Sequence, residues 1–371
     1  SPDNIRKMSE LKGTPVQQVA IGSCTNSSYK DLMTVASILR GKKVASGTSF
    51  IVAPGSRQVF EMIARNGALA DIIASGARVM ESSCGFCIGA GQAPPTNGVS
   101  LRTNNRNFEG RSGTASGQVY LVSPETAALS AIAGEMVNPL DYPAQEFPFV
   151  AMPDRFRIDD SMVLPPAGTP VTIIRGPNIG EPPYTSPLPD ELTCVVGLKV
   201  GDKITTDHIM PAGQRLKYRS NIPAYARYVF ENVDPEFSSR ALADREKGLF
   251  TAIVGGASYG QGSSREHAAI CPMHLGVRLV MAKSFERIHS DNLINFGIIP
   301  LVFKNAGDYD RIKAGDSLEI TKLRTLVMEA ETIPVTIGGS PYDFTLALSQ
   351  RQRAILIEGG LLNYTKKKFG A

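Results

Sequence analysis

The stretch ESSCGFCIGAG, residues 81–91, decides how the rest of the chain is interpreted. It places two thiols, Cys84 and Cys87, three positions apart in a turn that is rich in glycine and serine. A third thiol, Cys24, lies far upstream in the similar stretch GSCTN. Structural zinc takes four protein ligands, whereas an iron–sulfur cube can be held by three thiolates with one iron left open. The three cysteines therefore indicate a cluster site if the fold brings them together.

The same cysteines allow a second interpretation. A Cys-x-x-Cys pair is also typical of thioredoxin-like dithiols and of half zinc sites, and Cys24 would then be an unrelated core cysteine. Against this, all three thiols lie in small polar turns where backbone N–H groups can donate to sulfur. Cys194 and Cys271 lie in apolar or helical contexts and are predicted to be buried structural cysteines.

Composition excludes several classes of protein. The 371 residues are enough for two or three domains, and 42% hydrophobic with 20% charged residues is typical of a globular chain. The net charge of +4 gives little support to a nucleic-acid partner, and no apolar run approaches the roughly 20 residues of a membrane helix. Five cysteines without a disulfide framework indicate a reducing compartment, for which we expect the cytoplasm, or the mitochondrial matrix in a eukaryote.

The apolar pattern of residues 14–135 predicts repeated strand–turn–helix units. Strands are expected at 16–21, 49–52, 78–80, 99–102 and 119–122, and helices at 29–40, 58–65, 69–75 and from Ser123 onward. Such alternation implies a parallel sheet, whose ligands gather at the carboxyl ends of the strands. Cys24, the Cys84–Cys87 pair and Asn105 with Arg106 each follow a strand, so we expect all three loops at one sheet edge.

The second half of the chain begins after a change in composition. Residues 136–190 hold twelve of the chain's 25 prolines, which predicts an extended linker. A second α/β unit follows, with strands expected at 193–200, 251–254, 278–281, 317–320, 326–329 and 344–348, and helices at 224–231, 265–270 and 291–296. The predicted domains are therefore 1–135 and 191–371, joined by the linker 136–190.

A glycine-rich loop, GGASYGQGSSREH at 255–267, lies between a predicted strand and a predicted helix. Its unpaired N–H groups and the helix dipole favour an anion. Ser263 with Glu266 three positions on could be no more than a helix capping box. A serine surrounded by N–H groups and Arg265 could instead have its alkoxide stabilised and act as a base.

Arginines form the next candidate site. Arg106 and Arg111 lie in the loop NNRNFEGR, and guanidinium binds carboxylate through two parallel hydrogen bonds. The alternative is that they are ordinary surface arginines. Arg219 and Arg265 are further candidates for a polyanionic substrate. The pair Asp207-His208 suggests proton transfer, whereas four histidines without His-x3-His spacing do not favour a histidine metal site.

Taken together, these motifs resemble the aconitase family of iron–sulfur hydro-lyases, in the family's order and over nearly the whole chain. The matching stretches are GSCTNSSY at 22–29, SCGFCIG at 83–89, NRNFEGR at 105–111, DHI at 207–209, KYR at 217–219 and GSSREH at 262–267. The resemblance implies the third aconitase domain, a parallel-sheet α/β domain with the cluster-ligand loops. It also implies a proline-rich linker and the swivelling α/β fourth domain.

The resemblance also implies roles for individual residues. A [4Fe–4S] cluster would be held by Cys24, Cys84 and Cys87. Ser263 would be the base, and the carboxylates of a small tri- or dicarboxylate would be bound by Arg106, Arg111, Arg219, Ser264 and Arg265. Asn105 and Asp207 would support the site. The implied reaction interconverts citrate and isocitrate through cis-aconitate, because iron assists departure of hydroxide while arginine stabilises the charge that forms beside a carboxylate.

The chain departs from the family in three places. Met210-Pro211 stands where the best-known members carry a serine and a small residue, and Phe86 replaces a common proline. The family's first two domains, which carry the acid groups, are absent. With its start at Ser1 and no initiator Met, the chain is expected to be the C-terminal portion of a longer protein. The missing N-terminal domains would be its partners, so we expect the isolated chain to be inactive and its cluster to be labile or absent.

Two alternatives stay open at this point. A homoaconitase or an isopropylmalate isomerase would use the same cluster chemistry on another substrate. An apo-form RNA-binding regulator would use the scaffold without a cluster.

Overall fold

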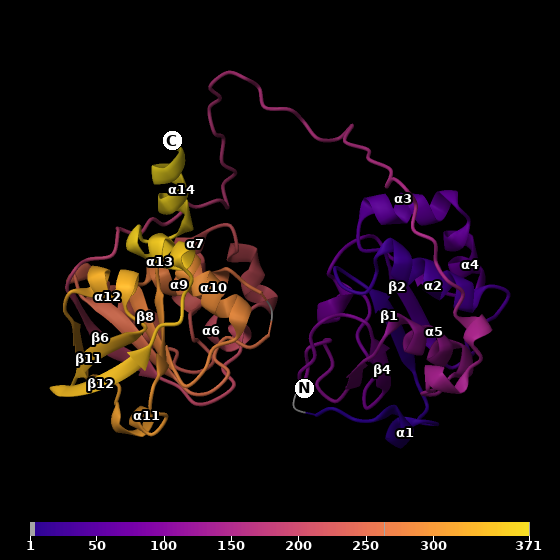
Figure 1. Ribbon diagram of the computed structural model, residues 1–371, viewed down its shortest axis with the longest axis horizontal. Helices are drawn as coiled ribbons and strands as arrows, with labels where there is room; N and C mark the ends of the chain where they lie inside the picture. The colour runs from indigo at the N-terminus through magenta and orange to yellow at the C-terminus, as the bar shows by residue number, and fades with distance from the viewer. Residues whose placement is uncertain (1–3, 263, 371) are drawn as a thin grey trace. The chain divides into compact units, whose positions relative to one another are not determined.

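The computed structural model describes residues 4–262 and 264–370. These form two compact units that divide between Pro170 and Val171, inside the segment that the prolines mark as a linker. In each unit strands are combined with helices (Figure 1), which confirms the predicted α/β class. The predicted domain limits of 1–135 and 191–371 stay a prediction.

The first unit is built on a five-stranded sheet. Its strands are β1 (Gln18–Gly22), β2 (Ser49–Ala53), β3 (Arg78–Val79), β4 (Val99–Arg102) and β5 (Gln118–Leu121). Its α-helices are α1 (Met8–Leu11), α2 (Tyr29–Leu39), α3 (Arg57–Arg65), α4 (Ala68–Ala74) and α5 (Pro124–Ala133). All strand pairs are parallel, in the order β3-β2-β1-β4-β5. The predicted parallel sheet is therefore confirmed, and each predicted strand and helix of this half lies within a few residues of its observed position.

The sheet buries its two faces against different partners, because successive side chains on a strand point to opposite sides. Val19, Ile21 and Leu101 belong to the core that also contains the apolar residues of helices α2 and α5. Ala20 and Ile51, one position out of phase, belong instead to a small cluster with Phe86 and Cys87. The turn that carries the cysteine pair therefore packs on the sheet face that the helices leave uncovered.

Helix α2 is held at its start by a capping box. The Ser28 side chain accepts a hydrogen bond from the backbone N–H of Asp31, and the Asp31 carboxylate accepts one from the backbone N–H of Ser28. Such caps contribute about 1 kcal/mol. This fixes where the loop after β1, which contains Cys24, joins the helix.

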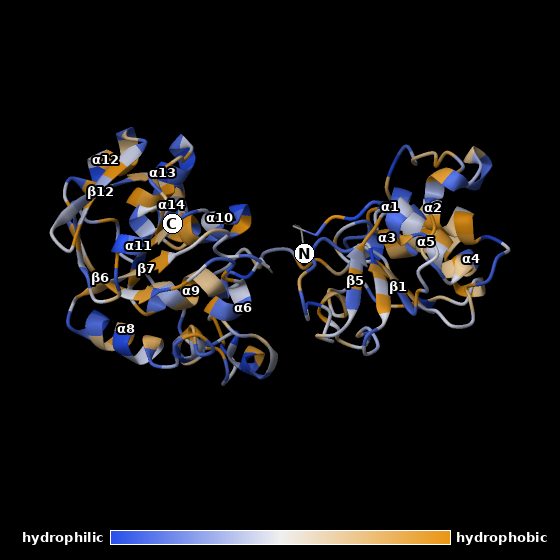
Figure 2. Ribbon diagram, turned by 90° about the horizontal axis from the view of Figure 1, so that it is seen from below, coloured by the Kyte–Doolittle hydropathy of each residue, from blue (hydrophilic) through white to orange (hydrophobic). Residues whose placement is uncertain are grey.

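The second unit is a seven-stranded closed barrel with helices around it. Its strands are β6 (Leu192–Lys199), β7 (Phe250–Gly255), β8 (Val277–Ala282), β9 (Ile299–Phe303), β10 (Ser317–Ile320), β11 (Thr332–Ile337) and β12 (Ser340–Thr345). Strands β6 to β9 pair in parallel, whereas β10, β11 and β12 form antiparallel pairs that close the barrel through β6 and β9. Figure 2 shows β7 as hydrophobic and the surface helix α8 as largely hydrophilic.

The helices of this unit include several that the apolar pattern did not predict. They are α6 (Thr206–Ile209), α7 (Ile222–Tyr225), α8 (Phe237–Glu246), α9 (His267–His274), α10 (Arg287–Asn295), α11 (Asp308–Arg311), α12 (Leu323–Glu329), α13 (Gln350–Ile357) and α14 (Leu361–Phe369). Short 3-10 turns occur at Gly213–Tyr218 and Ala226–Tyr228.

Among the sequence predictions in this unit, one was wrong and two were wrong in part. Residues 326–329, predicted as a strand, are the end of helix α12, whose buried Leu323 and Val327 are four positions apart on one helix face. The helix predicted at 224–231 ends by Tyr228, because Phe230 has a positive φ of 59°. The last strand lies at Ser340–Thr345 rather than at 344–348, since a turn at Gly338-Gly339 pairs it with β11.

The predicted linker, residues 136–190, has little regular structure, and its two ends attach to different units. Arg157 bonds to Glu61 at 2.7 Å, and the Phe156 ring lies 6.0 Å from that of Tyr29. At the other end, Leu188 belongs to the barrel core. Within residues 4–262 and 264–370, no helix is long and apolar enough to cross a membrane.

Candidate functional site

Three loops meet at the carboxyl edge of the parallel sheet. The loop after β1 carries Cys24 and is tied to the loop after β4 through Thr103. The Thr103 hydroxyl accepts a hydrogen bond from the backbone N–H of Gly22 at 2.9 Å, and the Asn26 side chain donates to the Thr103 carbonyl at 2.6 Å. Ser23 has a positive φ of 83°, a sparsely populated conformation for a residue other than glycine that is often found at functional sites.

The Cys84–Cys87 turn continues into a short 3-10 helix, Phe86–Ile88, which ends at Gly89. Gly89 has a φ of +84°, and a methyl group there would lie 2.3 Å from the Ser112 carbonyl oxygen. The cysteine turn is therefore in close backbone contact with the loop that carries Arg106 and Arg111.

The structure brings the three thiols into one neighbourhood. Cys24 and Cys84 are exposed and Cys87 is buried, and none of the three forms a disulfide. The pKa of the Cys84 thiol is raised to about 11, first by burial and then by the hydrogen-bonded Cys87 and the nearby Cys24, while Arg111 opposes them. These mutual effects place Cys24 and Arg111 close to the cysteine pair, although 60 residues of sequence separate Cys24 from Cys84.

The loop after β4 presents its polar groups at the same edge. Asn105 is exposed, and Arg106 and Arg111 are half-buried. The Arg111 guanidinium lies 5.8 Å from the centre of the Phe108 ring. The side-chain oxygen of Asn104 is buried, with no hydrogen-bond partner in the described part of the chain. Such an arrangement suits an anionic ligand, because guanidinium and amide groups are well placed to bind carboxylate.

In the second unit, Asp207 and Arg265 form an ion pair. Asp207 lies on α6, and its carboxylate accepts a hydrogen bond from Arg265 at 2.6 Å. The same guanidinium nitrogen donates to the Met210 carbonyl at 3.3 Å. Arg265 keeps 17% of its side chain exposed, so the pair lies near the surface and remains accessible to an anion.

The other predicted residues of this unit lie around the start of α9. Ser264 and Arg219 are exposed, and the Arg219 carbonyl oxygen is 2.9 Å from the Nε2 atom of His267. Ser263, the predicted base, lies outside the described residues. Helix α9 begins at His267 with Glu266 at its N-cap and no side-chain cap bond from Glu266.

Comparison with known proteins adds two matches that follow the chain's own division. Residues 3–134 match the model of the aconitase family (aconitate hydratase), and residues 207–306 match that of the aconitase C-terminal domain. Aconitate hydratases align at about 30% identity along the full chain. The chain belongs to the aconitase family.

Several relatives show how much of an aconitase the chain represents. A mitochondrial aconitate hydratase of Gracilaria gracilis is 32% identical over all of the chain and 55% of its own length. A probable one of Dictyostelium discoideum is 31% identical over 94% of the chain and 52% of its length. A mitochondrial homocitrate dehydratase of Saccharomyces cerevisiae is 31% identical over 83% and 45%. The chain spans about half the length of the curated relatives it matches.

A solved structure completes the comparison. The 3-isopropylmalate dehydratase of Methanocaldococcus jannaschii is 31% identical, with a TM-score of 0.38, over 48% of this chain and 95% of that one. The names of the aconitate hydratases above place them in mitochondria, so they give no support to a cytoplasmic location for this aconitase-family chain.

The residues of this aconitase-family chain fit a cluster better than a single metal ion. Among the described residues, no three His, Cys, Asp or Glu side chains converge on one possible ion position. A cube of iron and sulfur asks for something different, because each thiolate binds a different iron atom. Cys24, Cys84 and Cys87 are free, lie near one another and have Arg111 beside them, so they offer the three thiols that such a cluster uses.

Arg102, at the end of β4, also lies at this edge and is not among the residues predicted from the sequence. Its side chain is fully buried beneath the cysteine turn and donates to the Phe86 carbonyl at 2.6 Å. The only available signal was the alternation in VSLR, residues 99–102, which puts Arg102 on the opposite sheet face from Leu101. An arginine at a strand end is ordinarily exposed, so the pattern alone did not single it out.

His289 is a buried polar group behind the glycine-rich loop. His289 lies on α10, and the residue is only 2% exposed. Neither of its ring nitrogens has a hydrogen-bond partner among the described residues. Its ring fills the space beside Gly260, where a methyl group would lie 2.2 Å from the imidazole. Burial lowers the pKa of His289 to about 4.

This burial predicts acid sensitivity of the second unit. Between pH 6.5 and 4 the unfolded chain binds a proton at His289 that the folded chain does not, so stability falls as pH falls through that window. The full loss is about 3 kcal/mol, from 1.36 kcal/mol for each pKa unit. Urea unfolding at several pH values checks this. His289→Phe should flatten the dependence, and an unchanged slope in that variant would contradict the assignment.

Proposed function

We propose that this chain is the C-terminal part of an iron–sulfur hydro-lyase that interconverts citrate and isocitrate by dehydration and rehydration through cis-aconitate. The observation that carries the proposal is the meeting of Cys24, Cys84 and Cys87 with Arg111 at one sheet edge. Family membership supports the class of reaction. The missing half of the relatives' length supports the expectation that this chain alone does not turn over substrate.

The proposed cluster would be held by the three thiols as thiolates. When bound, it supplies a Lewis acid that assists departure of a hydroxyl group. The arginines of the first unit, Arg106 and Arg111, bind substrate carboxylates and stabilise the negative charge that develops when a proton leaves the adjacent carbon. Asn105 orients the same carboxylates by hydrogen bonding.

The second unit supplies the remaining roles in this proposal. Ser263 takes the carbon-bound proton as a base, and Arg219, Ser264 and Arg265 bind carboxylates. Asp207 holds the Arg265 guanidinium in place through their 2.6 Å contact. A guanidinium fixed in this way loses less freedom when it binds a carboxylate, which favours tight and oriented binding.

The substrate is tested by binding to the cluster-loaded chain. The purified chain is loaded with iron and sulfide without oxygen, then titrated by calorimetry with citrate, isocitrate, homocitrate and isopropylmalate. We expect citrate and isocitrate to bind. In a separate assay of turnover, the ultraviolet absorbance of cis-aconitate should show negligible change over time, because the isolated chain is expected to be inactive. If homocitrate or isopropylmalate bound more tightly than citrate, that compound would become the proposed substrate. If none of the four compounds bound, the proposed function would be contradicted. Salt-dependent RNA binding by the apo chain would favour the regulatory alternative.

Replacing Arg265 with methionine is expected to weaken citrate binding by roughly 10- to 150-fold, because a hydrogen bond to a charged group contributes about 1.5–3 kcal/mol. Calorimetry on the loaded chain measures the change. Arg265→Lys keeps the positive charge but lacks the planar guanidinium, so its citrate affinity should fall between those of the wild type and Arg265→Met.

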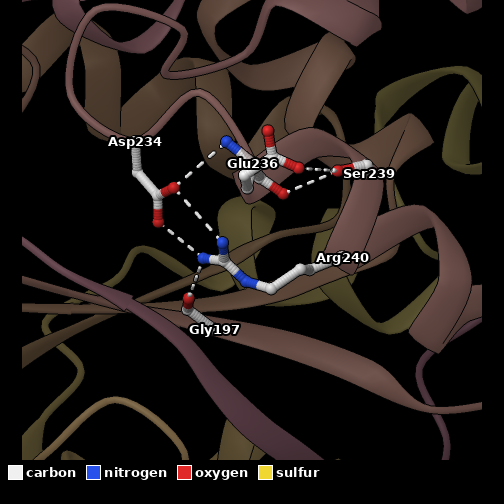
Figure 3. A network of polar contacts seen from close by, with 5 residues as sticks. All are labelled: Gly197, Asp234, Glu236, Ser239 and Arg240. Carbon is white, nitrogen blue, oxygen red and sulfur yellow. Dashed lines mark hydrogen bonds and ion pairs between the residues drawn. The ribbon is translucent and has the colours of Figure 1, made fainter.

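A matched control lies in the same unit. Arg240 lies on helix α8, and Asp234 lies in the turn before that helix. The Arg240 guanidinium donates two hydrogen bonds to the Asp234 carboxylate, at 2.5 Å and 3.2 Å, and one to the Gly197 carbonyl at 3.5 Å (Figure 3). Arg240→Met therefore also leaves an aspartate without its arginine, but away from the proposed carboxylate-binding residues. It should leave citrate affinity unchanged, and an equal loss in both variants would remove Arg265 from the site.

A further inference from the structure

Arg102 is a buried guanidinium surrounded by neutral acceptors. Its Nε donates to the Ser100 hydroxyl at 3.1 Å, and one terminal nitrogen donates to the Phe86 carbonyl at 2.6 Å. The other terminal nitrogen donates to the Gln18 amide oxygen at 2.7 Å and to the Gln92 carbonyl at 2.9 Å. Each of its three nitrogens therefore has an acceptor, but none of these acceptors carries a negative charge.

The position of Arg102 follows from strand register. Gln18 pairs with Ser100, and Ala20 with Arg102, so these four residues lie together on the face that the cysteine turn covers. The Ser100 hydroxyl also donates to the Gln18 amide oxygen at 2.7 Å. The sheet therefore holds the guanidinium in one place whether or not anything is bound above it.

The two carbonyls that Arg102 binds span the cysteine turn. Phe86 lies between the two thiols of the pair, and Gln92 lies where the turn returns to the sheet. One rigid side chain thus fixes the turn at both points from beneath. Burial lowers the pKa of Arg102 and the nearby Arg111 lowers it further, whereas a thiolate at Cys87 would raise it.

A buried charge with no opposite charge is costly, and the cost is offset when an anion is placed beside it. Three thiolates around an iron–sulfur cluster bring negative charge to this edge. We propose that Arg102 is a positioning residue that holds the 84–92 turn from beneath and supplies the buried positive charge that stabilises the thiolate-bound cluster. This inference rests on the cluster of the proposed function.

Arg353 offers a matched comparison in the second unit. It is also buried, and it donates to the carbonyls of Val327 at 2.6 Å, Ala330 at 2.7 Å and Leu346 at 3.2 Å. It belongs to the barrel unit, whereas all three candidate cluster ligands belong to the other unit. A purely structural buried arginine is therefore available as a control.

The test uses the full chain loaded with iron and sulfide without oxygen, in the wild type and in Arg102→Met, Arg102→Lys and Arg353→Met. Bound iron and sulfide, the rate of iron loss to a chelator, and the reduction potential of the cluster are measured. Arg102→Met should lose iron at least about tenfold faster, as removal of supporting groups around metal ligands typically does. Its reduction potential should fall, because removal of a positive charge disfavours the added electron.

The lysine variant separates charge from shape. Arg102→Lys should keep a potential near that of the wild type, but lose iron faster, since an ammonium group cannot span both carbonyls. Arg353→Met should lower the melting temperature and leave iron loss and potential unchanged. If Arg102→Met does not fold, the lysine variant still gives both readouts.

Three results would overturn the inference. One is wild-type iron loss and potential in Arg102→Met. Another is a lysine variant whose potential falls as far as that of the methionine variant. The third is a wild-type chain that takes up no iron and sulfide, which would also remove the cluster from the proposed function. If the chain held the cluster but bound no tricarboxylate, that result would contradict only the proposed function and would not affect the role of Arg102.

Discussion

Serine in place of Cys84 is expected to abolish the uptake of iron and sulfide that the wild-type chain shows when it is loaded without oxygen. With one of three thiolates removed, the cube keeps two protein ligands, and a serine hydroxyl is a poor substitute because it stays protonated near neutral pH and is a harder donor than thiolate. We expect the bound iron of Cys84→Ser to fall by at least tenfold relative to the wild type after loading and gel filtration. Cys24→Ser should behave in the same way.

Cys194→Ala is the control for this prediction. Cys194 is buried in the barrel core, where burial raises the pKa of its thiol to about 12 and keeps it protonated. Its loss should cost some stability of the second unit and leave iron uptake unchanged. Equal iron content in Cys84→Ser and the wild type would show that the three thiols do not share a cluster, and would return the redox-pair interpretation to first place.

Local pattern was sufficient to predict much of the first unit. In β1 and β2, short apolar runs end where glycine or alanine meets a polar turn, and these strands lie where periodicity placed them. Ser123 predicts the start of helix α5, because a serine side chain can accept a hydrogen bond from an unpaired N–H group. The meeting of distant loops at one edge followed from the rule that parallel strands end on the same side.

The barrel could not be predicted in the same way. Its closure depends on β10 pairing with β6, with Leu318 opposite Cys194, and no local pattern encodes a partner so far away. Leu323 and Val327 fit a helix, but LVME, residues 326–329, taken alone also fits a short strand. Arg102 was missed for a related reason, since its role depends on Gln18 and Phe86, which are adjacent only in the fold.

Alanine in place of Gly89 is expected to destabilise the first unit and to displace the cysteine turn. The residue has a φ of +84°, which costs a side chain roughly 1–2 kcal/mol, and its new methyl would meet the Ser112 carbonyl at 2.3 Å. Both neighbours at this contact are backbone, so the cysteine turn must move away from the loop that carries Arg111. We expect a loss of several kcal/mol in unfolding free energy, with a loss of iron uptake.

Gly91 provides the matched control, because it shares the left-handed conformation without the contact. Its φ is +73°, and a methyl group there would meet nothing within 4 Å. Gly91→Ala should therefore lower the free energy of unfolding by only about 1 kcal/mol, the cost of the left-handed backbone conformation, and should still take up iron. Urea unfolding and iron content of the two variants separate strain from displacement. If Gly89→Ala matched Gly91→Ala in both measurements, the close packing of the cysteine turn on the arginine loop would not be needed to hold the cluster.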